Sequence, residues 1–288
     1  MRKAGTPASF ARRFIAGETV AEAIEAARSL EQRGLAHTLD LLGESVASRE
    51  AANAATREYF EVLDAIVRAG IGRGLSLKVT QLGLDVDRTA ARDNLRRILE
   101  RAEAAGFFVR IDMESSTYTD VTLEMFEAMW REGYRRIGIV LQAALRRSEQ
   151  DLARMNALGA SVRIVKGAYR EPGTVAYQKK ADVNRAYARM LERALTEGHQ
   201  PAIATHDVAM IDLAKTIARE RRIGPDRFEF QMLYGIRRDL QSSLVKDGYR
   251  VRVYVPFGCE WFPYFMRRLG ERPANITFVI RNVLSDYT

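Results

Sequence analysis

Eight short apolar runs alternate along this chain with longer amphipathic stretches, and this alternation limits the possible folds more than any other feature. The runs cover residues 36–42, 75–80, 107–113, 136–141, 162–166, 202–205, 228–231 and 251–255. Strands that alternate with helices pair in parallel through right-handed crossovers. Eight such strands favour closure into a (βα)8 barrel over an open doubly wound sheet, which remains the alternative. We therefore predict an α/β barrel.

The stretches between the runs carry residues that start and stop helices. Asp87 is placed to cap a helix that ends at Gly106, and Ser148 is placed to open one that ends at Gly159. Residues 175–198 have the periodicity of a further helix. These signals support the alternation of strands and helices.

One main domain is expected, because no Pro/Ser-rich linker or low-complexity tract interrupts the sequence. Thr19 and Glu22 have the spacing of a capping box, which opens a helix before the first apolar run. The sequence thus predicts N-terminal helices over residues 1–34 that pack on the barrel, and a barrel domain over residues 35–288.

Cysteine content and hydropathy exclude several protein classes. Cys259 is the only cysteine, so neither an intramolecular disulfide nor a zinc site of several thiolates can form. A reducing, cytoplasmic compartment is therefore expected. No run of about 18 apolar residues occurs and no secretory signal follows Met1, so no spanning segment is expected. No spacing of Cys, His and carboxylate residues is typical of a metal site.

The charge balance leaves a second class of function open. The chain has 45 Lys and Arg residues against 37 Asp and Glu residues, a formal net charge of +8. This surplus is compatible with an anionic ligand, a nucleic acid or an anionic membrane surface. The alternative to an enzyme is therefore a non-catalytic basic binding module.

Polar side chains gather at the C-terminal ends of seven of the eight runs. They are Lys78, Thr80, Gln81, Asp112, Glu114, Gln142, Lys166, Thr205, His206, Asp207, Gln231 and Tyr254. In a parallel barrel these ends form one rim, where the loops that follow the strands build the site. We therefore predict a ligand pocket at this rim, although any one of these residues alone is typical of a hydrated loop.

Two segments have the chemistry of anion or ring recognition. The fifth run leads directly into Lys166, Gly167 and Ala168, where small residues let a flat ring or a phosphate approach the backbone. An ordinary turn is the alternative.

A second segment, residues 261–272, places Arg267 and Arg268 side by side on a predicted helix. Arg267 and Glu271 form an i,i+4 pair in the less favourable order, so helix stability does not explain them. Two arginines at one site can clamp a carboxylate while Glu271 orients them. A solvated basic face is the alternative.

Seven ordered segments, which span almost the whole chain, carry a resemblance to a known family. They are SLKVTQLGL (76–84), FVRIDMESS (108–116), VLQAALRRS (140–148), VRIVKGAY (162–169), ATHD (204–207), EFQMLYG (229–235) and VYVPFGCEWFPYFMRRLGERPAN (253–275). Together they resemble proline dehydrogenase in its small monofunctional bacterial form. The resemblance implies a distorted (βα)8 TIM barrel with extra N-terminal helices and a final helix over the barrel mouth.

The resemblance also implies a reaction and its partners. The expected reaction is oxidation of L-proline to 1-pyrroline-5-carboxylate by hydride transfer to FAD, with electrons passed to a quinone. A separate pyrroline-5-carboxylate dehydrogenase is expected to use the product. Membrane contact is expected to be peripheral, at the inner face of the bacterial membrane, and no nucleic acid is expected as a partner.

The resemblance assigns roles to individual residues. Asp112, which helps to hold the polar network of the site, and Arg163, placed near the flavin N5, are the catalytic pair. The residues matched to substrate binding are Lys78, Tyr169, Tyr254, Arg267, Arg268 and Glu271. The residues matched to cofactor binding are Met113, Gln142, Arg163, Lys166, Gly167, Ala168, Thr205, His206 and Gln231.

Two positions depart from the pattern of some family members. Arg170 stands where those members have tryptophan, and Asp207 stands where they have asparagine. Arg170 is expected to change packing around the outer part of the cofactor, and Asp207 to add a negative charge near it. Hydroxyproline remains an alternative substrate, although the phenol of Tyr254 is expected to crowd a ring hydroxyl.

Overall fold

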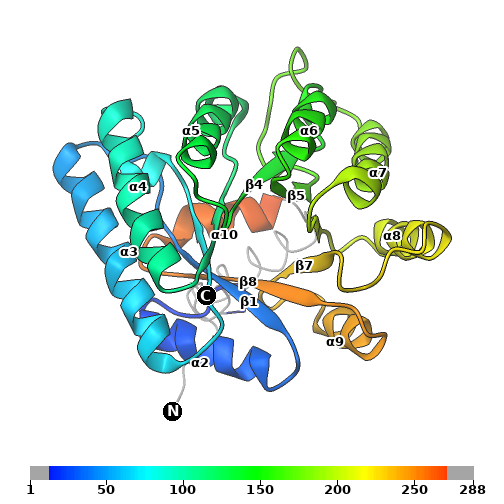
Figure 1. The fold of residues 1–288 in the computed structure, drawn as a ribbon, viewed down its shortest axis with the longest axis horizontal. Coiled ribbons are helices and arrows are strands. Elements are labelled where there is room, and N and C mark those ends of the chain that lie inside the picture. Colours follow the sequence, from blue (N-terminus) through cyan, green and yellow to red (C-terminus); the bar gives the residue numbers. More distant parts are fainter. Residues whose placement is uncertain (1–12, 271–288) are drawn as a thin grey trace, which may run out of the picture.

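The computed structural model describes residues 13–270, in which eight parallel strands close into a barrel (Figure 1). The strands are β1 (Ala36–Leu41), β2 (Gly74–Leu77), β3 (Phe108–Ile111), β4 (Ile137–Gln142), β5 (Ser161–Val165), β6 (Ala202–Ala204), β7 (Glu229–Leu233) and β8 (Val251–Phe257). Each strand pairs with its neighbours in chain order, and β8 closes on β1. Every strand overlaps one predicted run, so the barrel is confirmed and the open sheet is excluded.

Helices surround the barrel in the order of the chain (Figure 1). The helices that follow β1 to β7 are α3 (Arg49–Ala69), α4 (Arg88–Ala104), α5 (Thr119–Arg131), α6 (Ser148–Ala157), α7 (Lys180–Glu197), α8 (Val208–Glu220) and α9 (Arg238–Lys246). Short 3-10 turns, η1 (Thr80–Leu82) and η2 (Ser116–Tyr118), lie in the second and third loops. This arrangement places the loops after the strands at one end of the barrel.

The eighth outer position is taken by α2 (Val20–Glu31), which precedes the first strand. This helix contacts both β1 and β8 and buries Ala23, Ala27 and Leu30. The predicted capping box is present, because Thr19 Oγ1 accepts from Glu22 N–H while Glu22 Oε2 accepts from Thr19 N–H. Residues 1–12 of the predicted N-terminal region lie outside the described residues.

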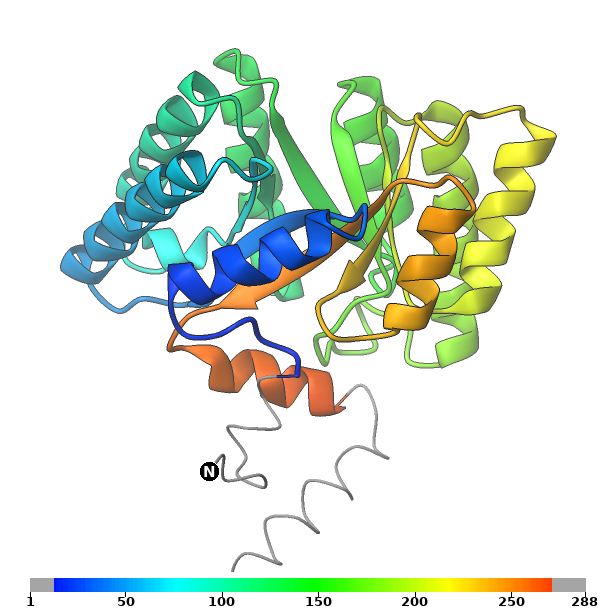
Figure 2. The same cartoon turned by 90° about the horizontal axis from the view of Figure 1, so that it is seen from below.

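The helix after β8 does not join the outer ring. Instead, α10 (Trp261–Gly270) lies across the C-terminal ends of the strands, as Figure 2 shows. Tyr264 and Phe265 on this helix pack in an apolar cluster with Phe14, Ile15 and Leu42. The N-terminal segment and the end of β1 therefore hold α10 over the mouth, which confirms the predicted final helix.

The strands alternate apolar and polar side chains although both of their faces are buried. Leu75 and Leu77 flank Ser76 on β2, and Val109 and Ile111 flank Arg110 on β3. Arg110 Nη1 donates to the carbonyl of Ser161 at 2.6 Å, and burial lowers the pKa of Arg110 to about 9. Side chains in alternate positions face opposite sides of a sheet, so an apolar layer lies on one face and a polar layer on the other.

The helices predicted to begin at Asp87 and Ser148 are confirmed, whereas the predicted start of a third helix at residue 175 is wrong. Asp87 caps α4 by accepting from Thr89 and Ala90 N–H groups. The helix predicted from residue 175 begins only at Lys180. Ala176 instead forms an isolated antiparallel bridge with Leu145, which holds this part of the loop against the β4 side of the barrel.

Ser148 opens α6 as its first residue rather than as its cap. Its hydroxyl donates to the carbonyl of Gln142 at 2.6 Å, so it ties the helix to the end of β4. The helix ends at Ala157, and Gly159 follows with a left-handed φ of 71°.

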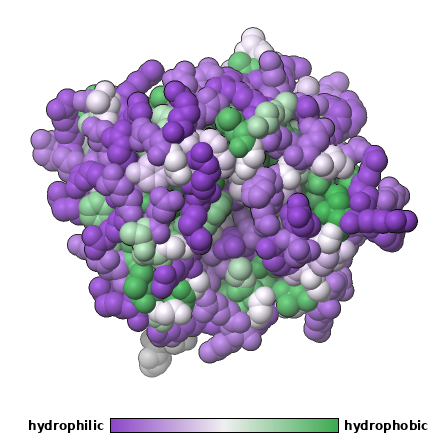
Figure 3. All heavy atoms as spheres, viewed as in Figure 1, coloured by the Kyte–Doolittle hydropathy of each residue, from purple (hydrophilic) through white to green (hydrophobic). Residues whose placement is uncertain are grey.

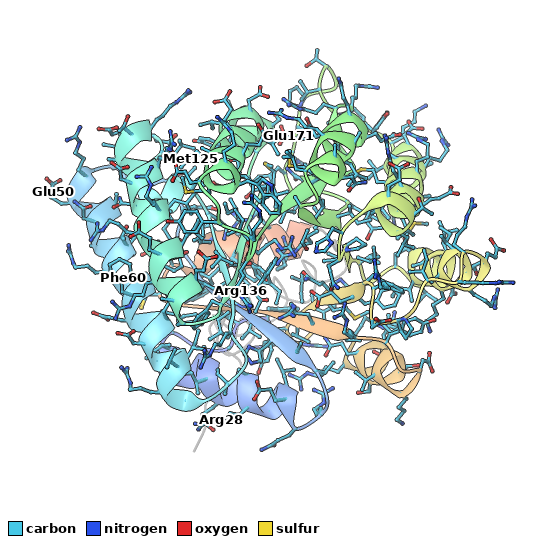
Figure 4. All side chains as sticks on the ribbon, in the orientation of Figure 1. Arg28, Glu50, Phe60, Met125, Arg136 and Glu171 are labelled. Carbon is cyan, nitrogen blue, oxygen red and sulfur yellow. The ribbon has the colours of Figure 1, made fainter. Side chains whose placement is uncertain are left out.

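The face of the molecule away from α10 is mainly polar (Figure 3). On the face away from α10, Figure 3 shows hydrophilic residues with only small apolar groups between them. Phe60 on α3, labelled in Figure 4, is partly covered by the guanidinium groups of Arg97 and Arg101 from α4. Between residues 13 and 270, no helix combines the length and the apolar character needed to cross a bilayer.

We expect Thr19→Ala to lower the free energy of unfolding by about 1 kcal/mol, because the first turn of α2 loses its cap. Since α2 contacts the two strands that close the barrel, the loss should appear in the global urea transition. Thr19→Ser keeps the accepting hydroxyl and is the matched control. Equal midpoints for the alanine and serine variants would contradict this role of the cap.

Candidate active site

A cavity of about 770 Å³ opens at the C-terminal end of the barrel, between the strand ends and α10. Among the residues that line it are all of the described residues to which the resemblance assigns a role: Lys78, Asp112, Met113, Gln142, Arg163, Lys166, Gly167, Ala168, Tyr169, Thr205, His206, Gln231, Tyr254, Arg267 and Arg268. Three further residues predicted at the rim, Thr80, Gln81 and Glu114, are buried but do not line the cavity. The residues with an assigned role are dispersed over 191 positions of the sequence, from 78 to 268. The barrel therefore brings the predicted set together at one rim.

Glu271 is the one predicted site residue that cannot be placed, because it lies outside the described residues. Arg170 is exposed and is not among the residues that line the cavity, so its effect on the outer part of the cofactor stays a prediction.

Sequence reasoning missed several lining residues. They are Val140, Val165, Gln178, Lys180, Val183, Asn184, Ala204, Met232 and Leu233. Some of them are next to predicted residues on the same strands. A position near the end of a strand was therefore the sequence signal that could have identified them. Lys180, Val183 and Asn184 come from the first turns of α7, which only the path of the preceding loop places at the cavity.

Arg163 is the centre of a buried polar network. Its Nη1 donates to Asp112 Oδ1 at 2.6 Å, its Nε donates to Gln231 Oε1 at 2.6 Å, and its Nη2 donates to Ser76 Oγ at 3.3 Å. Tyr254 donates its hydroxyl to Asp112 Oδ2 at 2.7 Å. Burial and the negative charge of Asp112 raise the pKa of Tyr254 well above its usual value, so its phenol stays protonated.

Lys78 lies beside a carboxylate that sequence reasoning missed. Its Nζ is 3.4 Å from both carboxylate oxygens of Asp40, a residue of β1 with no exposed surface. Burial alone lowers the pKa of Lys78, but attraction to Asp40 and Asp112 outweighs burial and leaves the pKa above its usual value. The one signal in the sequence was that Asp40 is the single acidic residue of the first run, residues 36–42.

The arginine pair of α10 reaches the cavity from above the strand ends. Arg267 Nη1 donates to Glu44 Oε1 at 2.7 Å, and its guanidinium carbon is 5.7 Å from the ring centre of Tyr169. The guanidinium carbon of Arg268 is 5.1 Å from the ring centre of Tyr264. Both arginines line the cavity, and the acid seen to pair with Arg267 is Glu44.

Lys166, which also lines the cavity, is held by two acceptors. Its Nζ donates to Asn184 Oδ1 and to Asp207 Oδ2, each at 2.6 Å. Asp207 also accepts from Ala209 N–H as the cap of α8. The hydrogen bond with Lys166 lowers the pKa of Asp207, so the unusual acid adds a negative charge at the cavity.

Backbone and amide groups give the cavity a narrow, polar floor near β4 and β5. A Cβ at Gly167, whose φ is 115°, would lie 3.1 Å from the side chain of Ala144 and 3.3 Å from Gln142 Oε1. His206 Nε2 accepts from Leu233 N–H at 3.0 Å, so the ring proton lies on Nδ1. A side chain at position 167 would crowd Ala144 and Gln142, and the bare backbone of Gly167 lines the cavity instead.

The size and donor set of the cavity fit an organic cofactor better than an ion. Cavities of roughly 300–1,000 Å³ hold ligands of cofactor or drug size. Apolar walls from Met113, Val140 and Val165 adjoin the donors of Lys166 and Gln142. Within the described part of the chain, no three His, Cys, Asp or Glu side chains come together to hold a metal.

Comparison with known proteins identifies the family. A sequence model described as proline dehydrogenase matches residues 23–281. The chain belongs to the proline dehydrogenase family. Proline dehydrogenase 2 of Bacillus subtilis is 43% identical over 273 residues, which cover 95% of this chain and 90% of that one. Proline dehydrogenase of Deinococcus radiodurans is 44% identical over 280 residues, which cover 96% and 90%.

A solved structure shares the fold of this proline dehydrogenase family member. Proline utilization A from Bdellovibrio bacteriovorus, inactivated by N-propargylglycine, superimposes with a TM-score of 0.85 at 27% identity. The match covers 91% of this chain and 32% of the larger protein. The resemblance expected from the seven sequence segments is therefore confirmed.

We expect Asp40→Asn to destabilise the protein by about 3 kcal/mol near neutral pH, because Lys78 would lose its buried partner. Without that partner, burial should push the pKa of Lys78 below its usual value. The folded protein would then bind fewer protons than the unfolded chain, so stability should rise with pH towards about 10.4.

Urea unfolding at about pH 7 and about pH 9.5 measures this effect, and the deficit of Asp40→Asn should narrow at the higher pH. The matched control is Asp93→Asn, which removes an exposed partner of Arg96. A deficit of equal size at both pH values would contradict the role of Asp40 as the counter-ion of Lys78.

Proposed function

We propose that this chain oxidises L-proline to 1-pyrroline-5-carboxylate with FAD as its bound cofactor, and that the electrons pass to a quinone. The observation that carries this proposal is the convergence of Lys78, Arg267 and Arg268 on the cavity that also contains the Arg163–Asp112 pair. Family membership and the names of the two bacterial relatives support proline as the substrate.

The three cations are suited to a small carboxylate. Arginine offers two parallel donors to a carboxylate, while lysine acts as a compact point charge. Lys78 is buried and stays protonated next to Asp40, and Arg267 is held by Glu44. These side chains would hold the carboxylate of proline from two sides, with the aromatic rings of Tyr169 and Tyr254 beside the pyrrolidine ring.

A separate part of the cavity fits a flavin. Gln142, Lys166, Gly167, Thr205, His206 and Gln231 would hold it, together with Met113 and Ala168. A flavin, when bound, supplies the acceptor for the hydride that leaves the ring carbon next to the proline nitrogen. The close approach to the backbone at Gly167 and the charge of Lys166 suit a flat ring system that carries phosphates.

The protein's own side chains contribute position and charge. Oxidation of a secondary amine requires the neutral amine and a fixed distance between the reacting atoms. Arg163 supplies a positive charge that is locked by Asp112 and Gln231, and such a charge stabilises negative charge that develops during transfer. Tyr254, fixed by Asp112, excludes water from the same region.

The electron acceptor and the downstream step are part of the proposal. A quinone would meet the protein at a membrane surface, through a peripheral contact of a protein held in the cytoplasm. A separate pyrroline-5-carboxylate dehydrogenase would then oxidise the product. Proline is favoured over hydroxyproline, because the phenol of Tyr254 is held in place by Asp112 and cannot turn away from a ring hydroxyl.

Anaerobic titration with proline tests the central claim. The purified protein should contain flavin, be yellow, and bleach as L-proline is added, with one flavin reduced per active site. A colourless protein that binds no added FAD and shows only salt-sensitive binding to nucleic acid or anionic vesicles would overturn the proposal in favour of a basic binding module.

We expect Arg268→Met to raise the Michaelis constant for proline at least roughly tenfold, because a charged contact to a carboxylate is worth about 1.5–3 kcal/mol. The matched control is Arg146→Met, since Arg146 also stacks on a tyrosine, Tyr177, but does not line the cavity. Unchanged steady-state kinetics for Arg268→Met would remove the carboxylate clamp from the mechanism.

A further inference from the structure

Glu229 lies beneath the cavity, at the start of β7, and does not line it. Its Oε1 accepts from Gln231 Nε2 at 2.5 Å, two residues along the same strand. Gln231 Oε1 in turn accepts from Arg163 Nε at 2.6 Å. A chain of two short hydrogen bonds therefore connects a residue outside the site with the central cation of the site.

The chemistry of the three groups leaves one orientation for the amide. A carboxylate only accepts hydrogen bonds, and a guanidinium only donates them, whereas an amide has one end of each kind. The amide nitrogen of Gln231 must therefore face Glu229, and its oxygen must face Arg163. A rotated amide would place two donors against each other at Arg163 and two acceptors against each other at Glu229.

Arg252 keeps Glu229 ionised and in place. Arg252 Nε donates to Glu229 Oε1 at 2.8 Å, and Arg252 Nη1 donates to the carbonyl of His37 at 2.8 Å. Burial alone raises the pKa of Glu229, but Arg252 and Gln231 outweigh burial and hold it below the usual value. The carboxylate is therefore a fixed acceptor at neutral pH.

The contact with Gln231 defines the plane of the Arg163 guanidinium. Nη1 is held by Asp112 and Nη2 weakly by Ser76, but Nε has Gln231 as its acceptor. The guanidinium carbon also lies 5.3 Å from the ring centre of Tyr254. If the amide oxygen turns away, the guanidinium can rotate about its bond to Asp112, and its charge moves relative to the cavity.

We propose that Glu229, held by Arg252, is a positioning residue that fixes the amide of Gln231 and thereby orients Arg163 for the oxidation. This inference rests on the proposed function, because it assigns Arg163 a part in that reaction. It adds a residue pair, Glu229 and Arg252, that neither touches the cavity nor belongs to the predicted site.

A double-mutant cycle on the flavin-loaded protein tests the proposal. Glu229→Gln keeps the shape but presents the Gln231 amide with a group that donates as well as accepts. It should slow flavin reduction by proline in a single turnover by roughly tenfold and change the proline KM much less, since misplacement of about 1 Å can cost up to about 100-fold. The flavin midpoint potential is the second measurement.

Arg163→Met provides the other side of the cycle. If Glu229 acts through Arg163, adding Glu229→Gln to Arg163→Met should change neither the reduction rate nor the potential appreciably. If Glu229 acts only through its charge or through packing, the two effects should add. Additive effects on the potential and the rate would overturn the proposal.

Three controls keep the outcomes distinct. Glu149→Gln removes a partner of Arg189 outside the cavity and should leave rate and potential unchanged. Glu229→Asp keeps the charge but shortens the reach to Gln231, so it should reproduce the kinetic defect if Glu229→Gln does not fold. Wild-type protein that binds flavin but is not reduced by proline would defeat the proposed function, whereas a wild-type rate in Glu229→Asp would defeat this inference alone.

Discussion

The buried contact between Arg163 and Asp112 is the interaction on which the site depends. It joins β5 to the end of β3 through a 2.6 Å hydrogen bond in the interior of the barrel, where an unpaired charge would be strongly unfavourable. Each partner is satisfied further by neutral groups, Gln231 and Ser76 for the arginine and Tyr254 for the carboxylate. The pair can therefore remain charged and fixed while the cavity above it receives a ligand.

This interior differs from a barrel filled by apolar layers. Apolar side chains form an extensive core cluster that joins strands and helices, while the alternate positions of several strands carry Asp40, Ser76, Arg110, Arg163 and Glu229. These side chains form hydrogen bonds with other side chains and with backbone carbonyls, and in this set of described residues the Nε of Arg110 is left without a partner. Rigidity at the cavity floor follows, because a side chain with two or three short hydrogen bonds cannot change rotamer without breaking them.

The position of α2 on the outside of the barrel allows α10 to lie over the site. Because α2 takes the outer position next to β8, the helix after β8 is free to lie across the mouth. It brings Arg267 and Arg268 to the cavity, and the apolar cluster around Phe265 fixes it to the N-terminal segment. Because α10 contacts both the N-terminal segment and the barrel, the closure of the barrel also determines where Arg267 and Arg268 lie.

The sequence by itself determined the barrel and most of the site. Alternation of short apolar runs with helix signals defines strand order, and the parallel direction places every C-terminal strand end on one rim. The positions of Lys78, Asp112, Gln142, Lys166, His206 and Gln231 at those ends were therefore readable, and the seven family segments supplied their roles.

Only the tertiary structure determined which side chains at the site pair with one another. Asp40, Glu44 and Glu229 face their partners only because strands and loops far apart in the sequence are brought together, and no local pattern records such a distance. The late start of α7 has the same cause, since the bridge between Ala176 and Leu145 outweighs a local helical preference. Local propensity acts within a few residues, whereas ion pairs and bridges depend on contacts that form only when the whole chain is folded.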